Sequence, residues 1–191
     1  MTRISIADAL LIIDVQNDFL PGGALAVPDG DAVIAPINRL MELPFGALVA
    51  TQDWHPAAHC SFVGQGGEWP AHCVAGSQGA ALADGLDRRS LTLTLQKGTS
   101  QAVDSYSAFI ENDRVTHTIL EEWLRERNIR RVFVTGLALD YCVMATAIDA
   151  RACGFESFIV LDACRGIGPE DVAIARAQRA GIKLLKEQDL S

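Results

Sequence analysis

Residues 131–154 read RVFVTGLALDYCVMATAIDARACG, an apolar run that passes directly into a helix-like pattern. Cys142 stands at the first turn of that helix, just past the expected strand. A thiol at a helix N-terminus has its pKa lowered by the backbone N–H groups and by the helix dipole. The stretch therefore predicts a strand followed by a helix, with Cys142 as a candidate nucleophile between them.

Further apolar, strand-like runs lie on either side of residues 131–136. They occupy residues 9–14, 47–52, 91–95, 156–161 and 182–185. Amphipathic helical patterns separate several of them, over residues 31–43, 116–128 and 169–181. Strands that alternate with helices indicate right-handed crossovers and a parallel sheet covered on both faces. We therefore expect an α/β fold with about six parallel strands, built as a single domain over residues 1–191.

Three local signals refine the expected helices. Pro36 predicts a kink or a late start in the first helix. Thr118 with Glu121 predicts a capping box in the second. Pro169 and Gly181 mark the beginning and the end of the last helix.

The composition narrows the classes of function. The 191 residues carry a net charge of −8, with 49% hydrophobic and 21% charged residues, as in an ordinary globular enzyme. The acidic balance argues against nucleic acid or an anionic membrane as a partner, and no apolar run approaches the ~20 residues that span a bilayer. The five cysteines form an odd, scattered set and not a disulfide framework. We therefore expect free thiols and a cytoplasmic protein.

Residues 53–90 interrupt the alternation of strands and helices. They contain three of the four histidines and one short helical stretch, expected near residues 77–83. A loop of this length in a compact domain is usually functional. Ligands of open α/β sheets bind beyond the carboxyl ends of the strands. Four polar side chains are expected to converge there: those of Asp14, Asp53, Lys97 and Cys142.

Three of these side chains form a candidate catalytic group. Alone, Asp14 could cap a turn or a helix, and Lys97 could be a solvated surface residue. With Cys142, they place a carboxylate, an ammonium and a thiol at separate strand ends. A partly buried carboxylate is a natural general base, and a neighbouring ammonium keeps it ionised, so that it can take the thiol proton.

The long loop also carries a candidate metal site, within the motifs DWHPAAH and WPAHC. Asp53 and His55 are two residues apart in an extended segment, so both can point to one side. His72 completes a set of three ligands if the loop folds back. Two imidazoles and one carboxylate are typical of a reactive Zn²⁺, Fe²⁺ or Mn²⁺ site. The alternative is that they only form loop hydrogen bonds, and His59 is either a fourth ligand or a supporting group.

Aromatic residues occur in polar segments near these candidate sites, namely Phe19, Trp69 and Tyr106. Each of them alone is explained by packing. Beside the candidate site, they could line a flat slot for an aromatic ring.

Five segments resemble the nicotinamidase/pyrazinamidase group of the isochorismatase-like cysteine hydrolases. They are IIDVQNDFLPGGALAV, ATQDWHPAAHCSF, WPAHCVAGSQGA, QKG followed by DSYSAF, and TGLALDYCVMATAIDA, in family order from residue 12 to residue 150. The resemblance implies an isochorismatase-like fold, which is a Rossmann-like three-layer sandwich. It also implies two sets of site residues: a catalytic triad of Asp14, Lys97 and Cys142, and metal ligands Asp53, His55 and His72.

The resemblance further implies how the substrate pocket is built. A cis peptide is expected between Leu137 and Ala138, and the N–H groups of Ala138 and Cys142 are expected to form an oxyanion hole. The positions that bind the substrate ring correspond to Phe19, Trp69 and Tyr106, with Leu137 and Ala138 beside them.

A member of this group is expected to hydrolyse nicotinamide, and also pyrazinamide, to the acid and ammonia through a cysteine thioester, in NAD salvage. The resemblance implies one divalent metal ion, with Zn²⁺ expected first and Fe²⁺ or Mn²⁺ as alternatives. The expected partner is a small-molecule substrate, with no nucleic acid or membrane, and a homo-oligomer is left open. Two other functions are a related cysteine amidohydrolase, such as a carbamoyl-amidase, and a non-catalytic metal-binding module.

Overall fold

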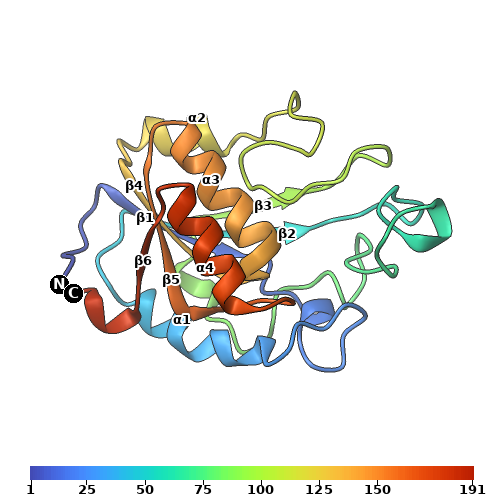
Figure 1. Cartoon of the computed structure of the whole chain (residues 1–191), viewed down its shortest axis with the longest axis horizontal. Coiled ribbons are helices and arrows are strands. Elements are labelled where there is room, and N and C mark those ends of the chain that lie inside the picture. Colours follow the sequence, from blue (N-terminus) through green and yellow to red (C-terminus); the bar gives the residue numbers. More distant parts are fainter.

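A six-stranded parallel sheet forms the centre of the structure, a computed structural model that describes residues 1–191. Its strands are β1 (Asp8–Ile13), β2 (Ala47–Asp53), β3 (Leu93–Lys97), β4 (Arg131–Leu137), β5 (Glu156–Arg165) and β6 (Lys183–Leu185). Their order across the sheet is β3-β2-β1-β4-β5-β6 (Figure 1). The expected α/β fold with a parallel sheet of about six strands is confirmed.

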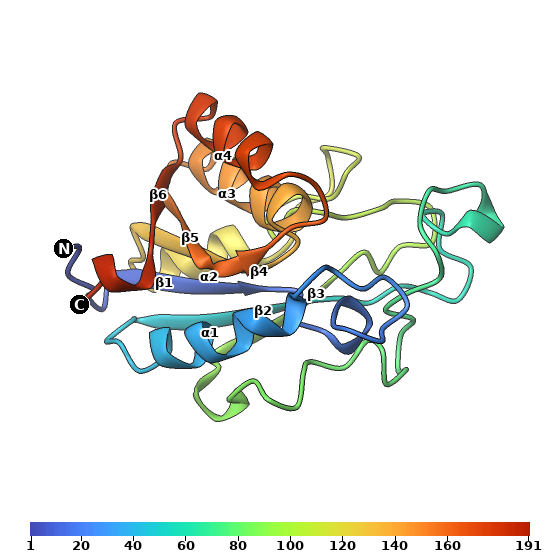
Figure 2. The same cartoon turned by 60° about the horizontal axis from the view of Figure 1, so that its bottom comes forward.

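Four helices cover the two faces of the sheet. They are α1 (Ile34–Leu40), α2 (Leu120–Glu126), α3 (Met144–Ala152) and α4 (Glu170–Arg179). Figure 2 shows α1 on one face and the other three helices on the opposite face. Leu10 and Ile12 of β1 belong to the same buried cluster as α1, whereas Leu11 and Ile13 belong to the cluster of α2, α3 and α4, because alternate strand residues point to opposite faces. None of the helices has the length and apolar character that crossing a bilayer requires.

The local sequence signal is confirmed at one helix start and is wrong at another. Helix α1 begins late, at Ile34, so Pro36 lies in its first turn, where a missing N–H removes no helical hydrogen bond. The predicted capping box is wrong. The Thr118 hydroxyl accepts the N–H of Leu120, whereas Glu121 pairs with an arginine one turn further along α2.

The short helix expected near residues 77–83 is absent, and the segment forms turns. The loop after β1 uses the carbonyl groups that such a helix would need. The N–H groups of Asn17 and Asp18 donate to Ala81 and Gly79. A chain whose carbonyl groups are bonded elsewhere cannot close its own helical turns.

The order of the strands places a crevice between β1 and β4. The chain runs to one side of the sheet through β1, β2 and β3, and to the other through β4, β5 and β6. Open sheets bind ligands beyond the carboxyl ends of the strands at such a reversal. Asp14 directly follows β1, and the turn that contains Cys142 follows β4. Asp53 and Lys97 are register partners at the ends of β2 and β3, and the segment after β2 projects beyond this edge (Figures 1 and 2).

Candidate active site

Lys97 is fully buried at the end of β3 and contacts three ionisable side chains. Its Nζ lies 3.0 Å from Oδ2 of Asp14, 2.5 Å from Oδ1 of Asp53 and 3.6 Å from Sγ of Cys142. Nζ also donates to the backbone carbonyl of Ser105. Burial opposes the charged form, but the two carboxylates prevail and hold the pKa of Lys97 well above its usual value. Lys97 is therefore a protonated ammonium in contact with two carboxylates and a thiol.

Asp14 is oriented by a residue of the neighbouring strand. The Thr51 hydroxyl accepts the Asp14 N–H at 3.1 Å and donates to Oδ1 at 2.6 Å. Oδ2 is buried and faces the Lys97 ammonium at 3.0 Å. A carboxylate oxygen of Asp14 lies within 4.8 Å of the Cys142 sulfur. Burial raises the pKa of Asp14, against the opposing effects of Lys97 and Thr51, so this carboxyl group is suited to both accepting and returning a proton.

Cys142 lies within a π-helical turn, Leu139–Val143, that connects β4 to α3. The expected lowering of its pKa by the helix N-terminus is wrong. Burial raises the pKa of the thiol well above its usual value, and Lys97 opposes this while Asp14 and Asp53 add to it. The resting thiol is therefore protonated and needs a base. All five cysteines are free, as expected, and the peptide between Leu137 and Ala138 is cis.

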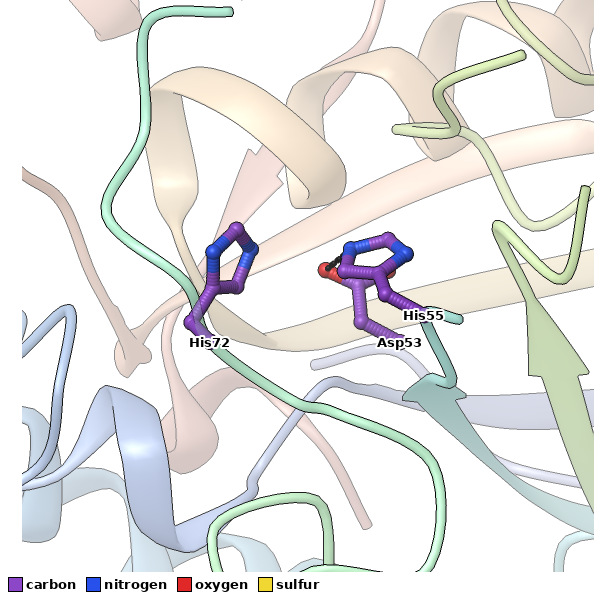
Figure 3. A group of neighbouring side chains, drawn as sticks. All are labelled: Asp53, His55 and His72. Atoms are coloured by element: carbon purple, nitrogen blue, oxygen red, sulfur yellow. Dashed lines mark ion pairs between the residues drawn. The ribbon is translucent and has the colours of Figure 1, made fainter. Parts of the chain in front are cut away.

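Three buried side chains with possible metal-ligand atoms lie together beside Lys97 and Cys142. The ligand atoms of Asp53, His55 and His72 lie within 4.8 Å of one another, with His72 opposite the other two (Figure 3). Nδ1 of His55 bonds the Gly98 carbonyl at 2.9 Å, and Nδ1 of His72 bonds the Pro70 carbonyl at 2.8 Å. Each imidazole therefore keeps Nε2 for the centre. Two oriented imidazoles and a carboxylate fit a divalent metal ion.

Gly98 and His59 both pack against the ring of His55. Gly98 has a φ of +61°, and a Cβ atom there would lie 2.5 Å from the His55 ring. His59 stacks on His55 with ring centroids 3.9 Å apart. Its Nδ1 bonds the Ser61 hydroxyl and its Nε2 bonds the Val103 carbonyl. Because both ring nitrogens are engaged, the geometry favours a supporting role for His59 over that of a fourth ligand.

A pocket with about 410 Å³ of empty space, including its mouth, opens between the thiol and the histidines. It is lined by Phe19, Leu25, Val27, Asp53, Trp69, His72, Asp104, Ser105, Tyr106, Ala138, Tyr141, Cys142 and Ile167. Leu137, expected beside the ring, does not line it. This last residue of β4 is fully buried in the α1 side of the core, so Ala138 alone of the pair reaches the pocket.

Four aromatic side chains line the pocket: Phe19, Trp69, Tyr106 and Tyr141. Nε1 of Trp69 donates to the Tyr106 hydroxyl at 3.2 Å. Tyr141 meets both rings edge-on, with centroid distances of 5.2 Å to Trp69 and 5.7 Å to Tyr106. Phe19 lies 5.6 Å from the ring of His72. Such walls suit a flat aromatic ligand.

Several lining residues were missed by sequence reasoning: Leu25, Val27, Asp104, Ser105, Tyr141 and Ile167. Tyr141 adjoins Cys142 in the chain, so its place in the motif was an available signal. Ile167 lies in the loop after β5. Its position just past the end of a strand was the one signal in the sequence that could have placed it at the pocket.

Comparisons with known proteins agree with this geometry. The isochorismatase domain model matches residues 8–188. The nicotinamidase of Escherichia coli (strain K12) is 43% identical over 187 residues, covering 87% of this chain and 88% of the relative. PnC1 from L. infantum, solved in complex with nicotinate, has a TM-score of 0.96 and 44% identity, covering 100% of this chain and 98% of that one. The pyrazinamidase of Pyrococcus horikoshii, solved in complex with zinc, has a TM-score of 0.84 and 37% identity, covering 94% and 99%.

Proposed function

Because the chain belongs to the isochorismatase-domain family, we propose that it catalyses the reaction named for its relatives, the hydrolysis of nicotinamide to nicotinate and ammonia. It is an amidohydrolase that acts on a linear amide. The observation that carries the proposal is the buried Lys97, whose Nζ contacts both a candidate base, Asp14, and a candidate nucleophile, Cys142. An aromatic pocket opens directly on this thiol.

The first chemical step is attack by the thiol. Asp14 accepts the Cys142 proton on Oδ2, because Oδ1 already accepts the Thr51 hydroxyl. The sulfur then adds to the amide carbon. Lys97 stabilises the charge before and after the proton moves, because it lies beside both groups and is fully buried.

The oxyanion is held by the backbone N–H groups of Ala138 and Cys142. Collapse of the tetrahedral adduct breaks the carbon–nitrogen bond, and Asp14 returns its proton to the departing ammonia. Water then attacks the thioester, with Asp14 as the base. The carbon–sulfur bond breaks, nicotinate leaves and the thiol is restored.

Asp53, His55 and His72 would hold one divalent metal ion, which we propose is Zn²⁺ because a related pyrazinamidase was solved with zinc. When bound, the ion would supply a Lewis acid for the ring nitrogen. Phe19, Trp69 and Tyr106 enclose the ring and exclude water. Pyrazinamide keeps the ring nitrogen and the amide, so it is a second substrate, and the physiological role is the salvage of NAD breakdown products.

Release of ammonia from nicotinamide by the purified, metal-loaded protein tests the proposal. Ammonia and nicotinate should appear in equal amounts. Tight metal binding without ammonia release would favour a non-catalytic metal-binding module. Turnover of a small carbamoyl compound in preference to nicotinamide would favour the carbamoyl-amidase alternative.

A further inference from the structure

The rim of the pocket carries an exposed apolar residue that the chemistry does not use. Ile167 is 42% exposed, although it lines the pocket with Cys142 and Tyr141. It belongs to the short segment 166–169 that connects β5 to α4, and glycine stands on either side of it. A bound ring would cover apolar surface that Ile167 now exposes to water.

A carboxylate in the nucleophile turn holds this segment in place. Oδ1 of Asp140 accepts the Ile167 N–H at 3.1 Å, and Oδ2 accepts the Gly168 N–H at 2.7 Å. The Asp140 backbone carbonyl also accepts Nη1 of Arg176 from α4 at 3.0 Å. Asp140 precedes Cys142 by two residues in the same π-helical turn. Asp140 thus connects the turn that contains Cys142 both to the rim segment and to α4.

The two flanking glycines make the fit close. A Cβ atom at Gly166 would lie 3.1 Å from Oδ1 of Asp140, and one at Gly168 would lie 3.1 Å from Oδ2. Larger residues would push the segment away from the carboxylate. The closeness of the backbone therefore fixes where the Ile167 side chain stands relative to the pocket.

We propose that Asp140 is a positioning residue that holds Ile167 against the substrate ring, so that the two residues together set the affinity for the ring. The inference rests on the proposed nicotinamidase function and goes beyond it, because neither side chain takes part in bond making. A carboxylate suits this role, since each oxygen accepts one N–H. An asparagine would turn its own NH₂ group toward one of the two donors.

The test compares Ile167→Ala and Asp140→Asn with the wild-type, metal-loaded enzyme. Both should raise KM for nicotinamide at least about threefold while kcat changes less, because loss of apolar contact in a pocket weakens ground-state and transition-state binding alike. The inhibition constant of nicotinate, an equilibrium quantity, should rise in parallel. Asp162→Asn is the matched control. The Asp162 carboxylate likewise accepts a backbone N–H, from Glu187, but it does not line the pocket, so KM should stay unchanged.

The double variant separates positioning from independent effects. If Asp140 acts through Ile167, Asp140→Asn should add little to KM in the Ile167→Ala background. The proposal is wrong if the KM of the double variant rises by the product of the two single increases, or if Asp140→Asn keeps the wild-type KM. If Asp140→Asn fails to fold, Gly166→Ala takes its place, because its methyl group would lie 3.1 Å from Oδ1 of Asp140, so the carboxylate or the segment must shift and KM should also rise. Wild-type protein without nicotinamide turnover would reject the proposed function together with this inference, whereas an active wild type with unaltered variants would reject this inference alone.

Discussion

The ammonium of Lys97 lies 3.0 Å from Oδ2 of Asp14, and neither side chain is exposed to solvent. On its other side the same ammonium contacts Asp53 at 2.5 Å. A single buried cation therefore joins the candidate catalytic group to the candidate metal ligands. Changes at Lys97 should affect both stability and activity. Changes at Asp14 test the candidate catalytic group alone, and changes at the histidines test the candidate metal ligands alone.

Lys97→Met should lower the free energy of unfolding by about 3–5 kcal/mol at neutral pH, because it leaves the buried carboxylate of Asp14 without its cation. Denaturant unfolding of the metal-loaded protein measures this loss. Part of it should return as the pH falls, since protonation of Asp14 removes the unpaired buried charge. Lys183→Met is the control, and its exposed pair with Glu156 should contribute less than about 1 kcal/mol. Equal losses in the two variants would contradict a structural role for the buried cation.

Asp14→Asn removes the proton acceptor and keeps the shape of the side chain. Activity on nicotinamide should fall by about 10²- to 10⁴-fold, the range for loss of a general base. Residues that act as a unit are non-additive, so Asp14→Asn should cost little more in the Cys142→Ala background. Steady-state rates of the two single variants and the double variant decide this. A double variant that shows the product of both losses would mean that Asp14 does not act through the thiol.

The pH dependence of kcat/KM should report the ionisation of Asp14, because only the carboxylate can take the thiol proton. Burial raises the pKa of Asp14 above the usual aspartate value of 3.8, so activity should fall with decreasing pH at a midpoint above that value. The Thr51 hydroxyl opposes this rise. Thr51→Val should therefore move the midpoint to higher pH, whereas Thr94→Val, on the exposed side of β3, should not. The profile is measured with saturating metal, and a midpoint that moves down or stays in place in Thr51→Val would count against Asp14 as the base.

The metal should orient the ring and not make the nucleophile, because Cys142 already supplies one. Benzamide keeps the amide and the ring shape but lacks the ring nitrogen. We expect kcat/KM for nicotinamide to exceed that for benzamide by at least about tenfold. Removal of the metal, or His55→Ala, should erase most of this preference together with activity on nicotinamide. His117→Ala, at an exposed histidine, should leave both unchanged. The same preference in metal-free and metal-loaded enzyme would show that the ion does not recognise the ring.

Most strands were predictable because each is a short apolar run that ends at a polar residue. Two strands depart from this: β3 lies two residues later than expected, at Leu93–Lys97, and β5 continues four residues past its expected end, to Arg165. The extension of β5 pairs with Gly136 and Leu137 beyond an irregularity in the ladder. The pairing that keeps those residues in the sheet comes from another strand, so the local pattern did not contain it.

The candidate site was predictable where its residues stand at strand ends, as Asp14, Asp53 and Cys142 do. The parts that were missed depend on tertiary placement. Thr51 reaches Asp14 from the next strand. The helix-terminus rule failed for the pKa of Cys142 because burial, which no local pattern reports, raises that pKa.

The most direct test of the account is the rate of nicotinate and ammonia formation by Cys142→Ala beside the wild type, both metal-loaded and folded. A thioester cannot form without the sulfur, so the variant should lose essentially all turnover while still binding nicotinate and unfolding with wild-type cooperativity. Nicotinate formation by the variant within about tenfold of the wild-type rate would contradict the assignment of Cys142 as the nucleophile.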